Sequence, residues 1–254
     1  MYFEIYSYEE KIQLDIDIID KFFCKTDKEH YQQTIKNLLY LSLKIRSNIS
    51  FAIMIFNQFT VNSHEKHKTA LNQIFSYFKN ILDVDIIYYA VKSSISTGFT
   101  DASFAHFIVK KNWCSTLEYI FFMTDWSVSW SCKYQFIIAI SFMKIKYIDQ
   151  YNAAWKATWI QSFLKELNYW NLIKNSIIIK SDSQSAEILA LNSAFHIWIK
   201  HLNVVYHWQQ QQIEWKIFKF KDIAFKNNEA DRLFKLLDSQ LYRMFKDLIH
   251  MNEI

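Results

Sequence analysis

Hydrophobic positions in the first third of the chain recur every three or four residues. Between residue 31 and about residue 81 they form three groups: Leu38, Leu39, Leu41 and Leu43; Phe51, Ile53, Ile55 and Phe56; and Leu71, Ile74, Phe75 and Phe78. This spacing places apolar side chains on one face of a helix. The pattern predicts three amphipathic helices, with breaks near residues 47–48 and 62–63.

The pattern changes after about residue 83 to short runs rich in β-branched and aromatic residues. The runs DIIYYAV, SISTGFTDAS, TLEYIFFM and SVSWSCK predict strands, and a helical pattern follows from about residue 139 to residue 167. NSIIIKSDSQ and WKIFKFKDI then read as strands, whereas SAEILALN, IKHLNVVYHWQQQQ, NEADRLFKLL and SQLYRMFKDLI read as helices. Three antiparallel strands, a helix, a strand, helices, a strand and helices predict a mixed α/β sheet with helices packed on it. We expect a helical segment over residues 1–82 and an α/β domain over residues 83–254.

The composition allows a folded domain and limits where it works. With 254 residues, 51% of them hydrophobic, the chain can bury a sizeable core. A net charge of +4 permits an acidic partner without requiring one. The three cysteines lack the spacing of a zinc site or disulfide framework, and no signal peptide or apolar run of about 20 residues is evident. We therefore expect a soluble protein of a reducing intracellular compartment, cytoplasmic or nuclear, with no membrane partner.

Three aspartates lie where elements are expected to begin or end. Asp101 follows the first long strand, Asp182 ends the fourth, and Asp231 opens a late helix. Convergent carboxylates hold divalent cations, and two such ions can activate water for phosphodiester cleavage. Spacing alone is weak evidence, because the chain contains 25 acidic residues.

A series of short motifs strengthens this interpretation. GFTDASFA, STLEYIFFM, VSWSCKYQ, AISFMKIKYI, WIQSFLKEL, IKSDSQSAEILALNSAFHIWIKHLNVVYHW and EADRLFKLL occur in this order. In order and spacing they resemble the ribonuclease H domain at the end of a copia-type LTR retrotransposon Pol polyprotein. The region upstream, from YQQTIKNLLYLS to YFKNI, resembles the thumb and connection segment of the reverse transcriptase. The resemblance covers nearly everything after about residue 30. It implies a ribonuclease H-like mixed five-stranded sheet flanked by helices and preceded by a small helical segment.

The resemblance also implies a set of site residues, with one departure. Asp101, Asp182 and Asp231 match three of the four acids that bind Mg²⁺ or Mn²⁺ in this family. The fourth should be a glutamate, and this chain has Lys146 there, with Lys144 at a neighbouring position that is also usually acidic. We therefore expect that two-metal cleavage of the RNA strand of RNA–DNA hybrids is impaired or lost. We hypothesise that the Lys146 ammonium acts as a counterion between Asp101 and Asp182.

Four basic residues match the His-rich segment that follows the third family acid: His196, Lys200, His201 and His207. Such side chains could contact substrate phosphates or assist proton transfer. The alternative is that the histidines lie on a helix surface or in the core with a hydrogen-bond partner.

Other departures indicate a degenerate copy of the element. Glu118 stands where the family has a glycine, Trp113 where it has a basic residue, and no Asp-Asp pair follows a tyrosine, so the polymerase metal site is absent. The chain has no proline, and its one glycine, Gly98, precedes Asp101 by three residues. Three functions remain open: a hybrid-cleaving ribonuclease, a non-catalytic remnant that binds nucleic acid through lysines, and an unrelated α/β interaction protein.

Overall fold

The computed structural model describes residues 25–79, 84–86, 96–103, 115–123, 126–135, 142–169, 176–183, 203–233, 244–245, 248–249 and 251–253. The chain divides into two compact units, Met1–Tyr88 with Arg232–Ile254, and Tyr89–Asp231. The domain limits expected from the sequence, 1–82 and 83–254, stay a prediction. The compact units differ from those limits chiefly because Arg232–Ile254 is grouped with the N-terminal part.

The first unit contains the helices that the apolar periodicity predicts. They are α2 (Lys25–Lys44), α3 (Ser50–Asn57), preceded by the short η3 (Ser47–Ile49), and α4 (Glu65–Lys79). Tyr31, Ile35 and Leu38 of α2 are buried, and the Tyr31 hydroxyl donates a 3.0 Å hydrogen bond to the Phe56 carbonyl. The predicted breaks near residues 47–48 and 62–63 are confirmed. The unit also holds a two-stranded antiparallel ladder between β1 (Val84–Ile86) and β7 (Met251–Glu253).

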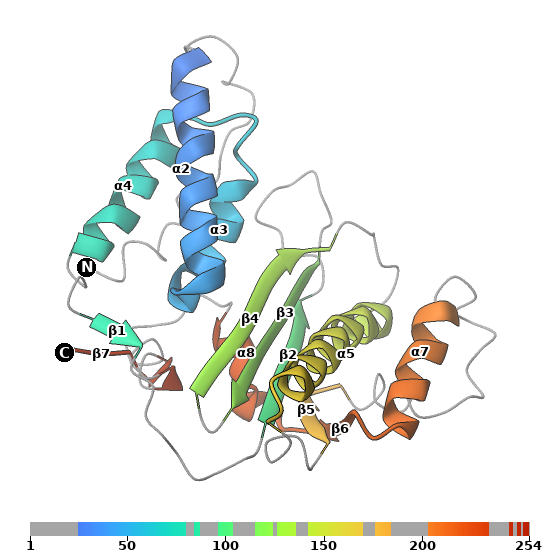
Figure 1. Cartoon of the computed structure of the whole chain (residues 1–254). Helices are drawn as coiled ribbons and strands as arrows, with labels where there is room; N and C mark the ends of the chain where they lie inside the picture. The colour runs from blue at the N-terminus through green and yellow to red at the C-terminus, as the bar shows by residue number, and fades with distance from the viewer. Residues whose placement is uncertain are drawn as a thin grey trace. The chain divides into compact units, whose positions relative to one another are not determined.

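The second unit is built on a five-stranded mixed sheet (Figure 1). Its strands are β2 (Ser96–Ser103), β3 (Thr116–Met123), β4 (Trp126–Tyr134), β5 (Ile177–Ser181) and β6 (Phe218–Asp222), in the spatial order β4-β3-β2-β5-β6. β2, β3 and β4 are antiparallel neighbours, whereas β5 runs parallel to both β2 and β6. Among the described residues, the helices after β4 include α5 (Phe142–Glu166), α7 (Asn203–Glu214) and α8 (Glu229–Leu233), which begins within this unit, with the short η7 (Phe225–Asn227) before α8.

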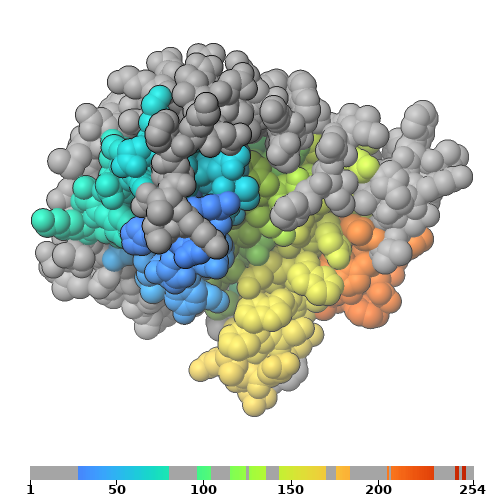
Figure 2. Space-filling view, turned by 90° about the horizontal axis from the view of Figure 1, so that it is seen from above, coloured from blue at the N-terminus to red at the C-terminus, as the bar shows by residue number. Residues whose placement is uncertain are grey.

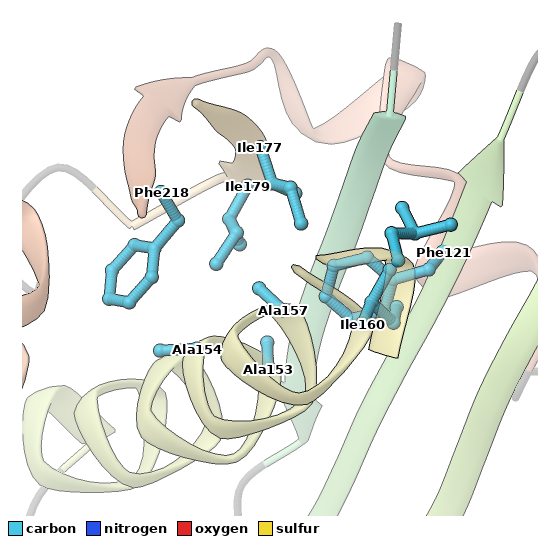
Figure 3. Close-up of a cluster of buried hydrophobic side chains, with 9 residues drawn as sticks. Phe121, Ala153, Ala154, Ala157, Ile160, Ile177, Ile179 and Phe218 are labelled. Atoms are coloured by element: carbon cyan, nitrogen blue, oxygen red, sulfur yellow. The ribbon is translucent and has the colours of Figure 1, made fainter. Parts of the chain in front are cut away.

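Helix α5 packs on one face of this sheet through small side chains (Figure 3). Ala153, Ala154 and Ala157 are fully buried, and Ile160 follows them on the same face. They contact sheet residues from β3, β5 and β6: Phe121, Ile177, Ile179 and Phe218. Alanines let the helix backbone approach the sheet closely, so the larger sheet residues fill the space between the two layers.

This order of strands and helices is the ribonuclease H-like fold that the sequence predicts. Two differences in detail are instructive. Asp101 does not follow its strand but lies within β2, and Gly98 lies in the middle of that strand rather than at its end. The predicted helix over SAEILALN lies outside the described residues, as does most of the one over SQLYRMFKDLI.

The position of Gly98 has a steric cause. Gly98 pairs with Phe121 on the neighbouring strand, and the Phe121 ring lies across the glycine backbone. A Cβ atom added at residue 98 would lie only 2.8 Å from Cδ1 of that ring. A side chain at this position would require the Phe121 ring or the strand to move, because carbon atoms in van der Waals contact lie about 3.5–4.0 Å apart.

Candidate functional site

The site centres on a buried lysine that contacts two buried or half-buried aspartates. Lys146 is 4% exposed, and its Nζ donates hydrogen bonds to Oδ1 of Asp101 and, at 2.8 Å, to Oδ1 of Asp182. Asp101 lies in β2, and Asp182 directly follows β5. The parallel register pairs Thr100 with Ser181, so the residues that follow them, Asp101 and Asp182, reach the same edge of the sheet.

The packing of α5 brings Lys146 to this edge. Its neighbours in the helix, Ile145 and Tyr147, are both fully buried, and Ile145 packs against Ala102 and Leu117 of the sheet. These contacts hold the first turns of α5 over β2 and β3. Lys146 is therefore buried beside them, and its ammonium group meets the aspartates at the sheet edge.

Another buried carboxylate, that of Asp149, lies one helical turn beyond Lys146. Asp149 accepts a 2.8 Å hydrogen bond from the Glu118 backbone N–H, and it also accepts one from the Thr100 hydroxyl. That hydroxyl lies 3.2 Å from the Glu118 carbonyl oxygen. Asp149 thus ties α5 to β2 and β3 at once.

Burial and mutual repulsion control the charges of these acids. Burial, with repulsion from Asp101, raises the pKa of Glu118 well above its usual range. Burial likewise raises the pKa of Asp149, despite the hydrogen bonds from Thr100 and Glu118. Burial also raises the pKa of Asp101, which the Lys146 ammonium offsets only in part.

Lys146 keeps its positive charge because its acidic neighbours outweigh the effect of burial on its pKa. Burial lowers the pKa of Lys146, but attraction to Asp101 and the hydrogen bonds to Asp101 and Asp182 outweigh burial and leave the pKa above its usual value. A charged ammonium is therefore held between the two aspartates. This is the contact that the counterion hypothesis requires.

Asp231 reaches the same cluster from α8. Its charge and a hydrogen bond both raise the pKa of Asp101, so the two side chains lie close together. Asn228 anchors this helix, because its Nδ2 donates a 3.0 Å hydrogen bond to the Thr100 carbonyl and its Oδ1 accepts one from the Ala230 N–H at 3.2 Å. Asn228 is thus the N-cap of α8 and its link to β2.

These residues do not fit a divalent cation. In the part of the chain that the structure describes, no group of three or more histidine, cysteine or acidic side chains is arranged to hold a metal ion. The Lys146 ammonium contacts an oxygen of Asp101 and one of Asp182, which a cation would need as ligands. The arrangement is that of an internal ion cluster.

The comparisons with known proteins agree with the motifs. No protein-family model matches the chain. It is 28% identical over 225 residues, or 89% of its length, to a retrovirus-related Pol polyprotein from a Nicotiana tabacum transposon, TNT 1-94. Identities of 26% and 25%, over 90% and 86% of the chain, link it to such polyproteins from Arabidopsis thaliana transposons RE1 and RE2. The chain is thus homologous to retrovirus-related Pol polyproteins.

The homology covers a small part of those relatives. This Pol-related chain spans 16% of the length of the tobacco polyprotein and 15% of each of the two Arabidopsis polyproteins. Among the described residues, no helix combines the length and the apolar content that crossing a bilayer requires.

The four basic residues predicted to contact substrate are only partly described. His207 lies on α7 and is exposed. His196, Lys200 and His201 lie outside the described residues of the Pol-related chain. Their proposed contacts with substrate phosphates stay a prediction.

Sequence reasoning missed three residues that organise the site. Asp149 follows Lys146 by three positions on a helix, a spacing that places both on one face, and this was the signal that could have found it. Asn228, directly before the acidic start of α8, carries the signature of an N-cap. Thr100 carries no such signal, because its contact with Asp149 depends on how α5 lies on the sheet.

Proposed function

We propose that this Pol-related chain is a ribonuclease H-like region that has lost hydrolysis of the RNA strand in RNA–DNA hybrids. One observation carries the proposal: the Lys146 ammonium bonds to Asp101 and Asp182, two of the acids expected to bind metal. The lysine replaces the two positive ions of the parent chemistry with one fixed charge. It stabilises the fold without metal, and it cannot activate water.

Electrostatics supports loss of metal binding rather than weakening alone. A divalent ion about 4 Å from the ammonium would be repelled by about 8 kcal/mol at an effective dielectric constant of about 20. Replacing a glutamate with a lysine also changes the charge of the site by two units, so the carboxylates no longer balance two Mg²⁺ or Mn²⁺ ions. Magnesium and manganese therefore belong to the parent family's chemistry and not to this chain's.

Association with nucleic acid is the second part of the proposal. Lys219 and Lys221 are exposed on the edge strand β6, and Lys180 lies opposite Lys221 in the register of β5 and β6. This row of lysines can contact phosphates without any metal. Lysines on an edge strand also prevent strands of separate molecules from pairing, so their presence alone does not require a nucleic-acid partner.

The decisive experiment restores the missing acid. Purified wild-type chain and the Lys146→Glu variant are incubated with an RNA–DNA hybrid labelled on the RNA strand, with Mg²⁺ or Mn²⁺ and with EDTA. We expect no cleavage by the wild type and metal-dependent cleavage by Lys146→Glu. Fluorescence anisotropy with the same hybrid should show binding by both proteins that weakens as salt is raised.

Two matched variants separate charge from position. Lys144→Glu makes the same charge change two residues away on the same helix and should not produce cleavage. Lys146→Gln removes the ammonium without supplying a metal ligand and should also show no cleavage. Metal-dependent cleavage by the wild type would overturn the proposal. Silence of a folded Lys146→Glu variant would show that the site has lost more than one ligand.

A further inference from the structure

The outward face of α5 carries a row of large exposed aromatic side chains. Trp155, Trp159 and Phe163 follow one another at four-residue intervals and are 58%, 52% and 45% exposed. Leu167, just beyond the helix, continues the row at 48% exposure. In Figure 2 the C-terminal part of α5, coloured gold, projects from the surface. We call these four residues the α5 ridge.

Apart from the contact of Trp155 with α7, the α5 ridge takes no part in the packing of α5 on its sheet. The opposite side of the helix, with its buried alanines, makes the contacts to the sheet. Each large aromatic side chain can bury about 150–250 Å². Because about half of each side chain is exposed, the row forms an apolar patch of a few hundred Å². That is the size of the largest patch on an ordinary monomer, and such patches are often functional.

The geometry of the rings argues against stacked nucleic-acid bases as the occupant. The Lys156 ammonium lies 3.9 Å from the centroid of the Trp159 ring. Phe163 is parallel to Trp159, with an interplanar angle of 5° and centroids 5.3 Å apart. Trp155 in turn packs against Trp208 of α7 at 5.4 Å. Base stacking needs free ring faces, whereas these rings already have partners beside their faces.

A helix with the same ridge is the partner that this geometry fits. Side chains four residues apart form ridges that pack into the corresponding grooves of a second helix. A second copy of α5 supplies such a ridge, and twofold symmetry requires only that the surface be complementary to itself.

The charges beside the ridge select an antiparallel arrangement. Lys156 lies near its N-terminal end and the exposed Glu166 near its C-terminal end, whereas Lys165 points to another side of the helix. Antiparallel pairing brings the Lys156 end of each copy to the Glu166 end of the other. We propose that α5 is the contact helix of a homodimer of this chain, formed by two antiparallel α5 ridges.

The size of the contact limits its strength. One helical ridge buries less than the roughly 800 Å² per partner of a standard stable interface. We therefore expect a weak dimer, with a Kd on the order of 10–100 µM. Each copy carries a net charge of +4, so the two copies repel each other at low salt. Added salt screens this repulsion and should strengthen the dimer.

The test measures mass against concentration. Sedimentation equilibrium of the full chain, from about 5 to about 500 µM, should show a monomer–dimer equilibrium in that range. Trp159→Ser with Phe163→Glu should shift the equilibrium to monomer by more than tenfold. Trp215→Ser is the matched control, because Trp215 is 61% exposed but lies after α7, off the ridge, and should leave the equilibrium unchanged.

A charge reversal tests the antiparallel orientation. Lys156→Glu should weaken the dimer by about two- to tenfold, and adding Glu166→Lys should recover most of the loss. A wild type that stays monomeric at all concentrations overturns the proposal. So does a dimer that survives the ridge substitutions in a protein with an unchanged circular dichroism spectrum, because another surface would then make the contact.

Discussion

At the residue scale, the surroundings of Gly98 and Lys146 restrict most strongly which side chain the position accepts. Lys146 is tolerated in the interior because two aspartates bind its ammonium group, and removing both would leave a buried charge without compensation. The role of Gly98 is steric, since its backbone φ is not positive and a Cβ atom there would meet a neighbouring ring. In a chain with one glycine, that position is the one where a Cβ atom would collide with a buried aromatic side chain.

The first prediction follows from that collision. Gly98→Ala should destabilise the second unit by about 1–3 kcal/mol, because the Phe121 ring or the strand must move. All nine tryptophans lie between residues 113 and 215, within this unit, so tryptophan fluorescence during urea unfolding measures its stability. In a Phe121→Leu background the same glycine substitution should cost less. Equal costs in both backgrounds would show that the ring is not the cause.

At the element scale, α5 makes three different kinds of contact on three parts of its surface. Its alanines pack on the sheet, its first turns carry Lys146 and Asp149 into the acidic cluster, and its outer face carries the α5 ridge. One helix therefore links the core, the site and the proposed dimer contact. Because apolar residues lie both on the side that faces the sheet and on the exposed side, the sequence of α5 has only a weak amphipathic pattern.

The second prediction concerns the side of α5 that faces the sheet. Ala157 is fully buried against the sheet, so Ala157→Leu should lower the free energy of unfolding by about 1–3 kcal/mol through overpacking. Lys165→Leu, an exposed position of the same helix, should change it by no more than about 0.5 kcal/mol. Urea unfolding followed by tryptophan fluorescence measures both. An unchanged stability for Ala157→Leu would mean that α5 lies further from the sheet than the structure has it.

At the scale of the whole molecule, the buried acids make the stability of the second unit depend on pH. Burial raises the pKa values of Glu118 and Asp149 well above their usual values of 4.5 and 3.8. The folded state therefore holds protons that the unfolded chain releases. Their contribution to stability is complete below about pH 4 and is lost as the pH rises through the raised pKa values. Lys146, whose pKa is also raised, keeps its contribution until the pH exceeds the ordinary lysine value of about 10.4.

The third prediction is the resulting pH profile. Between about pH 5 and pH 8 the free energy of unfolding should fall, by up to about 1.4 kcal/mol per pH unit for each proton-holding group. Asp149→Asn keeps an acceptor for the Glu118 N–H and should both raise stability at pH 8 and flatten the profile. Glu214→Gln, which neutralises an exposed acid, should leave the slope unchanged. Stability that rises over this range would contradict the account of the buried acids.

Much of the architecture could be read from local patterns. The helices of the first unit follow from apolar spacing, and the succession of strands along the chain follows from short β-rich runs ending at polar residues, because periodicity and turn chemistry act over a few residues. The ordered motifs then led to Asp101, Asp182, Asp231 and the anomaly at Lys146. The position of Asp101 inside β2 was missed, because strand ends depend on the neighbouring strand as much as on the residues themselves.

Contacts between residues that are far apart in the sequence could be identified only from the folded structure. Lys146 meets Asp101 across 45 positions and Asp182 across 36, and Asn228 reaches Thr100 across 128. Strand register and the packing of α5 on the sheet determine these contacts. Both depend on many small packing interactions that no single motif contains. The sequence by itself determined which elements form and which charged residues are available. The tertiary structure alone decided that the ammonium lies between the carboxylates, that Asp149 is buried beside them, and that Phe121 covers Gly98.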